Sequence, residues 1–378
     1  MRASFRLGRL FGIEIGIHYT WILAFVLISW SLAQGFFPQV YPGWTMGAYV
    51  TTGILAALLL FVSVLLHELA HSLVAKARGL PVGSITLFIF GGVSNLEGEA
   101  EKPSVEFTMS IVGPLTSLVL AVIFWGLSQL ISMPDSPAAA LLGYLWMINA
   151  LLAAFNLIPG FPLDGGRVLR AVIWGTTGNF VRATNIAAMI GRLFGWALIA
   201  FGLFQLLSGN FLGGLWIAFI GWFLSTAADA SRRDVTLRKG LSGVPVSALM
   251  DTDTETVSPQ ASVEEVVYNT FLRGRRHAVP VYQDDRLVGI VTLTDVKESP
   301  RHKWNQTTVA EIMTRQPLYI VAPEDDLSSA MKLIAQHDIN QVPVLRQGRL
   351  AGLLKRADII RHLQLSQELG MRPGQDKR

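Results

Sequence analysis

A long stretch without charge is the feature that most limits how this chain can fold. Between Ile15 and Leu66 there is no Asp, Glu, Lys or Arg. About 20 consecutive apolar residues suffice for a helix to cross the hydrocarbon core of a bilayer, and this stretch has room for two such helices. The first part of the chain is therefore expected to lie in a lipid bilayer.

Six transmembrane helices are expected within residues 1–230. Hydrophobic residues make up 51% of the chain and charged residues only 15%, and the hydrophobic ones are concentrated in this part. An even number of spans, with Arg and Lys gathered at the same ends, places both termini on the cytoplasmic side. The expected spans are about Ile17–Gln34, Ala48–Leu73, Val105–Ile131, Ala138–Ile158, Ile186–Leu207 and Phe211–Ala228.

The segment Ser84–Leu96 is too short and too rich in β-branched residues for a membrane helix. It is expected to form a hairpin or a re-entrant loop, which membrane depth tolerates only where protein or a wet cavity covers the backbone. Gly113-Pro114, in the middle of the third span, predicts a kink and close helix packing.

The second span ends in an H-E-x-x-H motif formed by His67, Glu68 and His71. On a helix the two histidines, four residues apart, share a face and can bind one metal ion. Glu68 is turned about 100° away, which suits proton transfer better than ligation. This pattern is typical of zinc hydrolases, in which three protein ligands leave a fourth position for a water.

Asp164 is the candidate for the third ligand. It follows the fourth span in a turn rich in proline and glycine, at the same depth as the histidines. The alternative is a turn-forming Asp whose side chain accepts a hydrogen bond from a nearby N–H. A site made of two histidines and one aspartate, with an open position, is a complete hydrolytic zinc centre.

Composition excludes several classes of site and partner. There is no Cys, so disulfides and thiolate ligands are absent and zinc must be held by His and carboxylate. The net charge of +4 fits Lys and Arg facing an anionic cytoplasmic leaflet. Because no basic run is interleaved with aromatic residues, nucleic acid is not an expected partner.

These motifs resemble those of the site-2 protease family of intramembrane metalloproteases. The resemblance covers residues 1–230 and rests on the H-E-x-x-H motif, on the segment from Asn156 to Gly166, and on Phe90-Gly91-Gly92 and Gly113-Pro114 between them. It implies that His67, His71 and Asp164 bind zinc and that Glu68 is the general base. It further implies that Asn156 and the strand near Phe90, Gly91 and Gly92 hold the substrate, a transmembrane protein whose helix is unwound by β-addition.

Two other places in the sequence bear on this resemblance. His18 matches a family position near the start of the first span, and we interpret it as structural. After Gly-Pro the chain has Leu115-Thr116-Ser117 in place of the short polar residues often seen there. A polar partner for the site is therefore not clearly indicated at that point.

The remainder of the chain contains an internal repeat. A polar linker at 231–243 leads into two copies, 244–300 and 307–366. Four pairs of residues match 63 positions apart: Met250 and Met313, Pro280 and Pro343, Gly289 and Gly352, Asp295 and Asp358. The copies resemble a tandem pair of cystathionine-β-synthase (CBS) domains, a soluble α/β module.

That resemblance implies regulation by an adenosine nucleotide such as ATP. Thr292 and Asp295 fit the ribose-binding pattern of the family, and Asp358 is the equivalent acid in the second copy. Because Lys355 stands there in place of the Thr, we expect one occupied site rather than two. The alternative is a structural module that forms a homodimer.

Together these features predict a zinc endopeptidase that cuts transmembrane helices near the cytoplasmic face, with a cytoplasmic CBS pair as sensor. One rival is a CBS-regulated transporter or channel, which would spread polar residues along several spans instead of gathering them at one depth. A second rival is a catalytically inactive relative, although Glu68 and all three candidate ligands are present.

Overall fold

The computed structural model describes residues 4–89, 91–96, 100–273, 277–284, 286–315 and 317–369. It divides into two compact units, Met1–Arg233 and Asp234–Arg378. Each unit is described by itself.

The first unit is a helical bundle with six helices long and apolar enough to cross a membrane within its described part. The predicted polytopic fold is confirmed. The first span joins three segments, α1, η1 and α2, into Thr20–Val40. The helices are α1 (Thr20–Ser31), η1 (Leu32–Phe36), α2 (Phe37–Val40), α3 (Met46–Ala77), α4 (Pro103–Ser128), α5 (Pro137–Asn156), α6 (Asp164–Thr177), α7 (Phe180–Leu207) and α8 (Phe211–Leu241).

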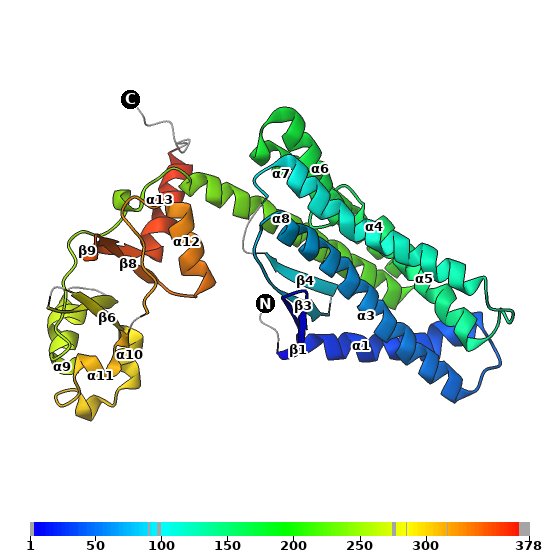
Figure 1. Cartoon of the computed structure of the whole chain (residues 1–378), viewed down its shortest axis with the longest axis horizontal. Coiled ribbons are helices and arrows are strands. Elements are labelled where there is room, and N and C mark those ends of the chain that lie inside the picture. The colour runs from blue at the N-terminus through cyan, green and yellow to red at the C-terminus, as the bar shows by residue number, and fades with distance from the viewer. Residues whose placement is uncertain are drawn as a thin grey trace. The chain divides into compact units, whose positions relative to one another are not determined.

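A four-stranded sheet in the order β1-β2-β3-β4 lies beside α3 (Figure 1). Its core is made by Ile13, Ile15 and Ile85, which pack on Leu69 of α3. The predicted hairpin is present as β3 and β4, whereas β1 and β2 were not predicted. The strands are β1 (Phe5–Leu10), β2 (Ile13–Ile17), β3 (Val82–Phe88) and β4 (Gly91–Leu96).

Three local features add detail to the sequence-based expectation. Asp164 is the first residue of helix α6, so the turn that follows the span α5 leads directly into another helix. Helix α4 continues through Pro114, which lies inside it. Residues 231–241, expected as part of a polar linker, continue helix α8 as far as Leu241.

The second unit contains two copies of one motif. In the first copy Val281 pairs with Gly289, and in the second Val344 pairs with Gly352, each followed by the same irregularity in register. The strands of each copy pack on a separate apolar cluster. The elements are η2 (Val246–Ala248), α9 (Val263–Val266), η3 (Val267–Leu272), β5 (Ala278–Gln283), β6 (Arg286–Thr292), α10 (Leu293–Glu298), η4 (Arg301–Lys303), α11 (Val309–Ile312), β7 (Thr314–Arg315), α12 (Leu327–Gln336), β8 (Gln341–Arg346), β9 (Arg349–Lys355) and α13 (Arg356–Glu368).

The two copies exchange packing partners. Val246, which precedes the first copy's strands, is buried in the core of the second copy. Val309, which precedes the second copy's strands, is buried in the core of the first. Neither copy therefore has a complete core without the other, and the pair forms one folded module.

Candidate metal centre

Helix α3 presents both histidines of the H-E-x-x-H motif on its buried face. His67 and His71 lie one turn apart with their ring centroids 4.9 Å from each other. Both side chains are almost fully buried, so they are withdrawn from bulk water by α3's packing against its neighbours. Two buried imidazoles that face the same point form one half of a metal site.

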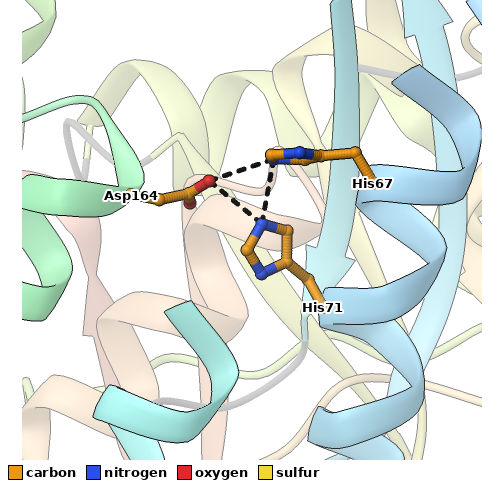
Figure 2. Close-up of side chains that lie close together, drawn as sticks. All are labelled: His67, His71 and Asp164. Carbon is orange, nitrogen blue, oxygen red and sulfur yellow. Dashed lines mark hydrogen bonds and ion pairs between the residues drawn. The ribbon is translucent and has the colours of Figure 1, made fainter. Parts of the chain in front are cut away.

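Asp164 completes the cluster from the first turn of α6 (Figure 2). Its Oδ2 lies 3.0 Å from Nε2 of His67 and 3.1 Å from Nε2 of His71, and the two Nε2 atoms are 3.2 Å apart. These three residues form the group of potential metal ligands found among the described residues. The structure thus brings together side chains 93 and 97 positions apart in the sequence.

The spacing and the donor set fit zinc. Ligand atoms about 2.0–2.1 Å from a tetrahedral metal lie roughly 3.3 Å from one another, which is close to the separations seen here. Nδ1 of His67 lies 2.9 Å from the hydroxyl of Ser117, and Nδ1 of His71 donates to the carbonyl of Met109. These partners on α4 leave both Nε2 atoms free to face the metal, the arrangement typical of histidine ligands.

Gly113 on α4 is needed for the two histidines to fit. A Cβ at this position would lie 2.1 Å from Nε2 of His71 and 2.7 Å from Nε2 of His67. No side chain can be accommodated there without displacing an imidazole. The Gly113-Pro114 pair, expected to allow close packing, therefore lies directly against the candidate ligands. Sequence reasoning had found the pair but not this contact.

Glu68 lies beside strand β4. Its Oε2 accepts a hydrogen bond of 2.8 Å from the hydroxyl of Ser94, and Ser72 donates in turn to Ser94. A Cβ on Gly92 would approach Cγ of Glu68 to 2.5 Å, so the strand backbone runs close to this side chain. The carboxylate is thereby held next to the cluster of ligands and to the edge of the sheet.

The charge state of Asp164 follows from its neighbours. Burial by itself would raise the pKa of this carboxyl, but its polar contacts with His67 and His71 and their electrostatic attraction hold its pKa well below the usual range. A lowered pKa favours the carboxylate, which is the form that ligates a cation.

The other candidate residues make local contacts or lie at the ends of elements. Asn156 ends α5, and its side-chain amide donates to the carbonyl of Leu152. Gly91 and Gly92 open β4, while Phe90 lies outside the described residues. His18 lies just before α1 and its Nδ1 is 2.9 Å from the hydroxyl of Thr20, a contact that favours a structural role.

The nucleotide-site candidates lie in the second unit. Thr292 and Asp295 form a capping box at the start of α10, in which Oδ2 of Asp295 accepts from both the amide and the hydroxyl of Thr292. Asp358 lies in the first turn of α13. Lys355, at the position equivalent to Thr292, makes an ion pair of 2.7 Å with Asp251.

Comparison with known proteins identifies the family. The model of peptidase family M50 matches residues 55–136 and 126–198, and that of the CBS domain matches 246–301 and 309–365. A candidate zinc metalloprotease of Synechocystis sp. is 36% identical over 97% of this chain and 97% of its own length. The chain belongs to peptidase family M50, the site-2 proteases.

A second curated relative agrees with this M50 assignment. A zinc metalloprotease of Methanocaldococcus jannaschii is 31% identical over 98% of this chain and 99% of its own length. The solved structure of a site-2 protease from the same organism is 33% identical and covers 61% of this chain and 95% of that one, with a TM-score of 0.43. The M50 chain described here is a multi-pass membrane zinc metalloprotease with a tandem CBS pair, and the transporter alternative is set aside.

Proposed function

We propose that this protease cleaves transmembrane helices of other membrane proteins, with His67, His71 and Asp164 as the zinc ligands and Glu68 as the general base. The observation that carries the proposal is the convergence of the three ligand atoms, all within 4.8 Å of one another, two of them on the helix that also carries Glu68. A site of this kind on helices of a bilayer protein suits peptide bonds that lie in or near the membrane.

Zinc, when bound, would supply the electrophile that polarises the scissile carbonyl and activates a water. The proton transfers and the orientation of the base depend on the chain's own residues. Glu68 takes a proton from the attacking water and can pass it to the leaving amine. Ser94, which donates to Oε2, fixes the rotamer of this carboxylate, so the carboxylate is oriented before substrate arrives.

The edge of β4 is the proposed binding surface for substrate. Within the described residues β4 has one strand neighbour, β3. An extended segment added at its other edge would run past Glu68, because Gly92 brings the β4 backbone close to that side chain. Gly91 and Gly92 would contribute to this edge, while Phe90, proposed with them to bind substrate, lies outside the described residues. Asn156, at the end of α5, is proposed to hold the substrate backbone or its oxyanion.

We further propose that cleavage occurs near the cytoplasmic face. Lys76 and Arg78 end the helix that carries His67 and His71, and positive residues mark cytoplasmic ends of spans. Six candidate spans among the described residues support the same, cytoplasmic side for both ends of the membrane part and for the CBS pair.

The experiment is a comparison of membrane proteomes from cells that contain the wild-type protein and cells that contain Glu68→Gln. Fragments that start or end inside a predicted transmembrane helix and require intact Glu68 would support the proposal. A purified candidate substrate should then be cut by the reconstituted full-length enzyme. If the purified wild-type enzyme binds zinc but cuts none of these helices, the chain is a substrate-binding relative and the proposal is wrong.

The CBS pair is proposed to bind one adenosine nucleotide and to regulate cleavage. Thr292 and Asp295 are half-buried, and their hydroxyl and carboxylate can exchange the capping hydrogen bonds for the ribose hydroxyls. In the second copy Lys355 replaces the Thr and pairs with Asp251, so Asp358 has no equivalent hydroxyl three residues before it. The proposed domain boundaries remain 244–300 and 307–366.

Calorimetry of the full-length protein with ATP, ADP and AMP tests this proposal. One site per chain is expected, lost in Asp295→Ala and kept in Asp358→Ala. Regulation requires that the nucleotide favour one state of the enzyme, and a tenfold preference corresponds to about 1.4 kcal/mol. If none of the three binds more tightly than about 1 mM, a dimerisation or structural role replaces the sensor, and the oligomeric state should then depend on the CBS pair.

A further inference from the structure

A buried ion pair joins α6 to α4 at a distance from the candidate ligands. Nε of Arg170 donates to Oε1 of Glu106 over 2.6 Å, and its Nη2 contacts the same oxygen. The Arg170 side chain is 11% exposed and that of Glu106 2%. Charges this deep are costly to bury unless the geometry is good, so the pair calls for a functional explanation.

Two aromatic rings enclose the same guanidinium. Its central carbon lies 4.9 Å from the centroid of Phe161 and 4.6 Å from that of Phe180. Phe161 lies three residues before Asp164, and its amide donates to the carbonyl of Ala187 on α7. Arg170 therefore contacts α4, the turn that leads into α6, and the start of α7 at once.

These contacts connect the two halves of the metal centre. On α4, Glu106 lies three residues before Met109, whose carbonyl accepts the hydrogen bond from His71. On α6, Arg170 shares a rigid helix of 14 residues with Asp164. The same helix α4 thus fixes an imidazole directly through Met109 and the carboxylate indirectly through Glu106.

We propose that Arg170 is a positioning residue which, through Glu106 and the rings of Phe161 and Phe180, holds Asp164 at the distance from His67 and His71 that binding of one metal requires. This inference rests on the proposed ligand roles. A side chain that fixes the element bearing a ligand acts on metal retention even though it never touches the metal.

The chemistry of arginine explains why another cation should not substitute. Its planar guanidinium offers two N–H groups toward one carboxylate and a flat face to each ring, whereas a lysine ammonium is a compact, more strongly hydrated charge. Arg170→Lys keeps the charge and removes the geometry. Replacing both partners by apolar residues, Arg170→Met with Glu106→Leu, removes the geometry without leaving a lone buried charge.

The test measures zinc retention in purified full-length protein. Zinc loss to a chelator, the melting temperature of the zinc-free protein and kcat/KM would be compared for wild type, Arg170→Lys and the double variant. We expect both variants to lose zinc at least ten times faster, with a zinc-free melting temperature near that of wild type. Arg192→Lys is the control. It alters the half-exposed ion pair in which Nη1 of Arg192 lies 3.6 Å from Oδ1 of Asp229, and it should retain zinc normally.

Two results would overturn the inference. One is wild-type zinc retention in the folded variants. The other is a fall in the zinc-free melting temperature that accounts for the faster loss in both variants, since Arg170 would then act on the fold alone. Asp164→Asn is measured in parallel: if it too retains zinc normally, the ligand assignment fails first, whereas rapid loss from Asp164→Asn alone leaves that assignment intact and rejects Arg170.

Discussion

The hydroxyl of Ser117 lies 2.9 Å from Nδ1 of His67, although the two residues are 50 positions apart and on different helices. Ser117 is fully buried, so this contact is protected from competition with water. It orients the imidazole so that Nε2 faces Asp164. Ser117 thus supports the metal centre although it was not among the residues expected to form it.

Removing this hydroxyl should weaken zinc binding. Loss of the residue that hydrogen-bonds to a metal-bound histidine typically lowers metal affinity 10- to 100-fold. We expect Ser117→Ala to raise the zinc dissociation constant within that range, measured by competition with a chromogenic chelator. Thr116→Ala is the matched control, since its hydroxyl bonds to the carbonyl of Val112 in its own helix. Equal zinc affinity in both variants would remove Ser117 from the site.

Glu68→Gln should separate zinc binding from catalysis. The amide is nearly isosteric with the carboxylate but cannot accept a proton, so cleavage should fall by about 10²- to 10⁴-fold. Zinc content and melting temperature should stay close to wild type, because the three ligands are unchanged. Substantial cleavage by this variant, measured with a reconstituted transmembrane substrate, would reassign the proton acceptor.

Gly113 and Gly126 both lie inside helix α4, so replacing either by Ala has a similar effect on helix propensity. A Cβ at Gly113 would lie 2.1 Å from Nε2 of His71, whereas nothing lies within 4 Å of a Cβ at Gly126. Gly113→Ala should therefore lose zinc and activity. Gly126→Ala should keep both and can gain about 1 kcal/mol of helix stability. Normal zinc content in Gly113→Ala would mean that α4 can shift away from His71 with little loss of zinc affinity.

The sequence was sufficient for the fold class and for naming the residues that meet at the cluster. Long uncharged stretches predict spans directly, and the turn around Asp164 is marked by its glycines and prolines. The sequence alone was insufficient where the structure depends on which strands pair with each other. Strand β2, for example, pairs in parallel with β3, and Glu14 lies opposite Ser84, contacts too distant in sequence for a local pattern to indicate.

The contacts on α4 were missed for a similar reason. Ser117, Met109 and Glu106 lie on an apolar helix, and each has its effect through a residue on another helix. A serine or a main-chain carbonyl in a span gives no signal of its partner. The continuation of α8 to Leu241 was missed because its polar composition resembles a linker, although the segment contains no proline that would end a helix.

Asp164→Asn should weaken zinc retention and activity together. A neutral amide is a poorer ligand for a dication than a carboxylate, and it also loses the charge that attracts both imidazoles. A bound metal stabilises the folded protein according to its concentration relative to the dissociation constant, by about 2.7 kcal/mol at a hundredfold excess. Chelation should therefore lower the melting temperature of the wild-type protein.

The same chelation should change the melting temperature of Asp164→Asn much less, because this variant holds little zinc to begin with. Asn156→Ala serves as the control, since its amide bonds within its own helix and not to the cluster. Its melting temperature should respond to the chelator as that of wild type does. If Asp164→Asn responds fully as well, Asp164 belongs to the turn before α6 and the metal centre must have another third ligand.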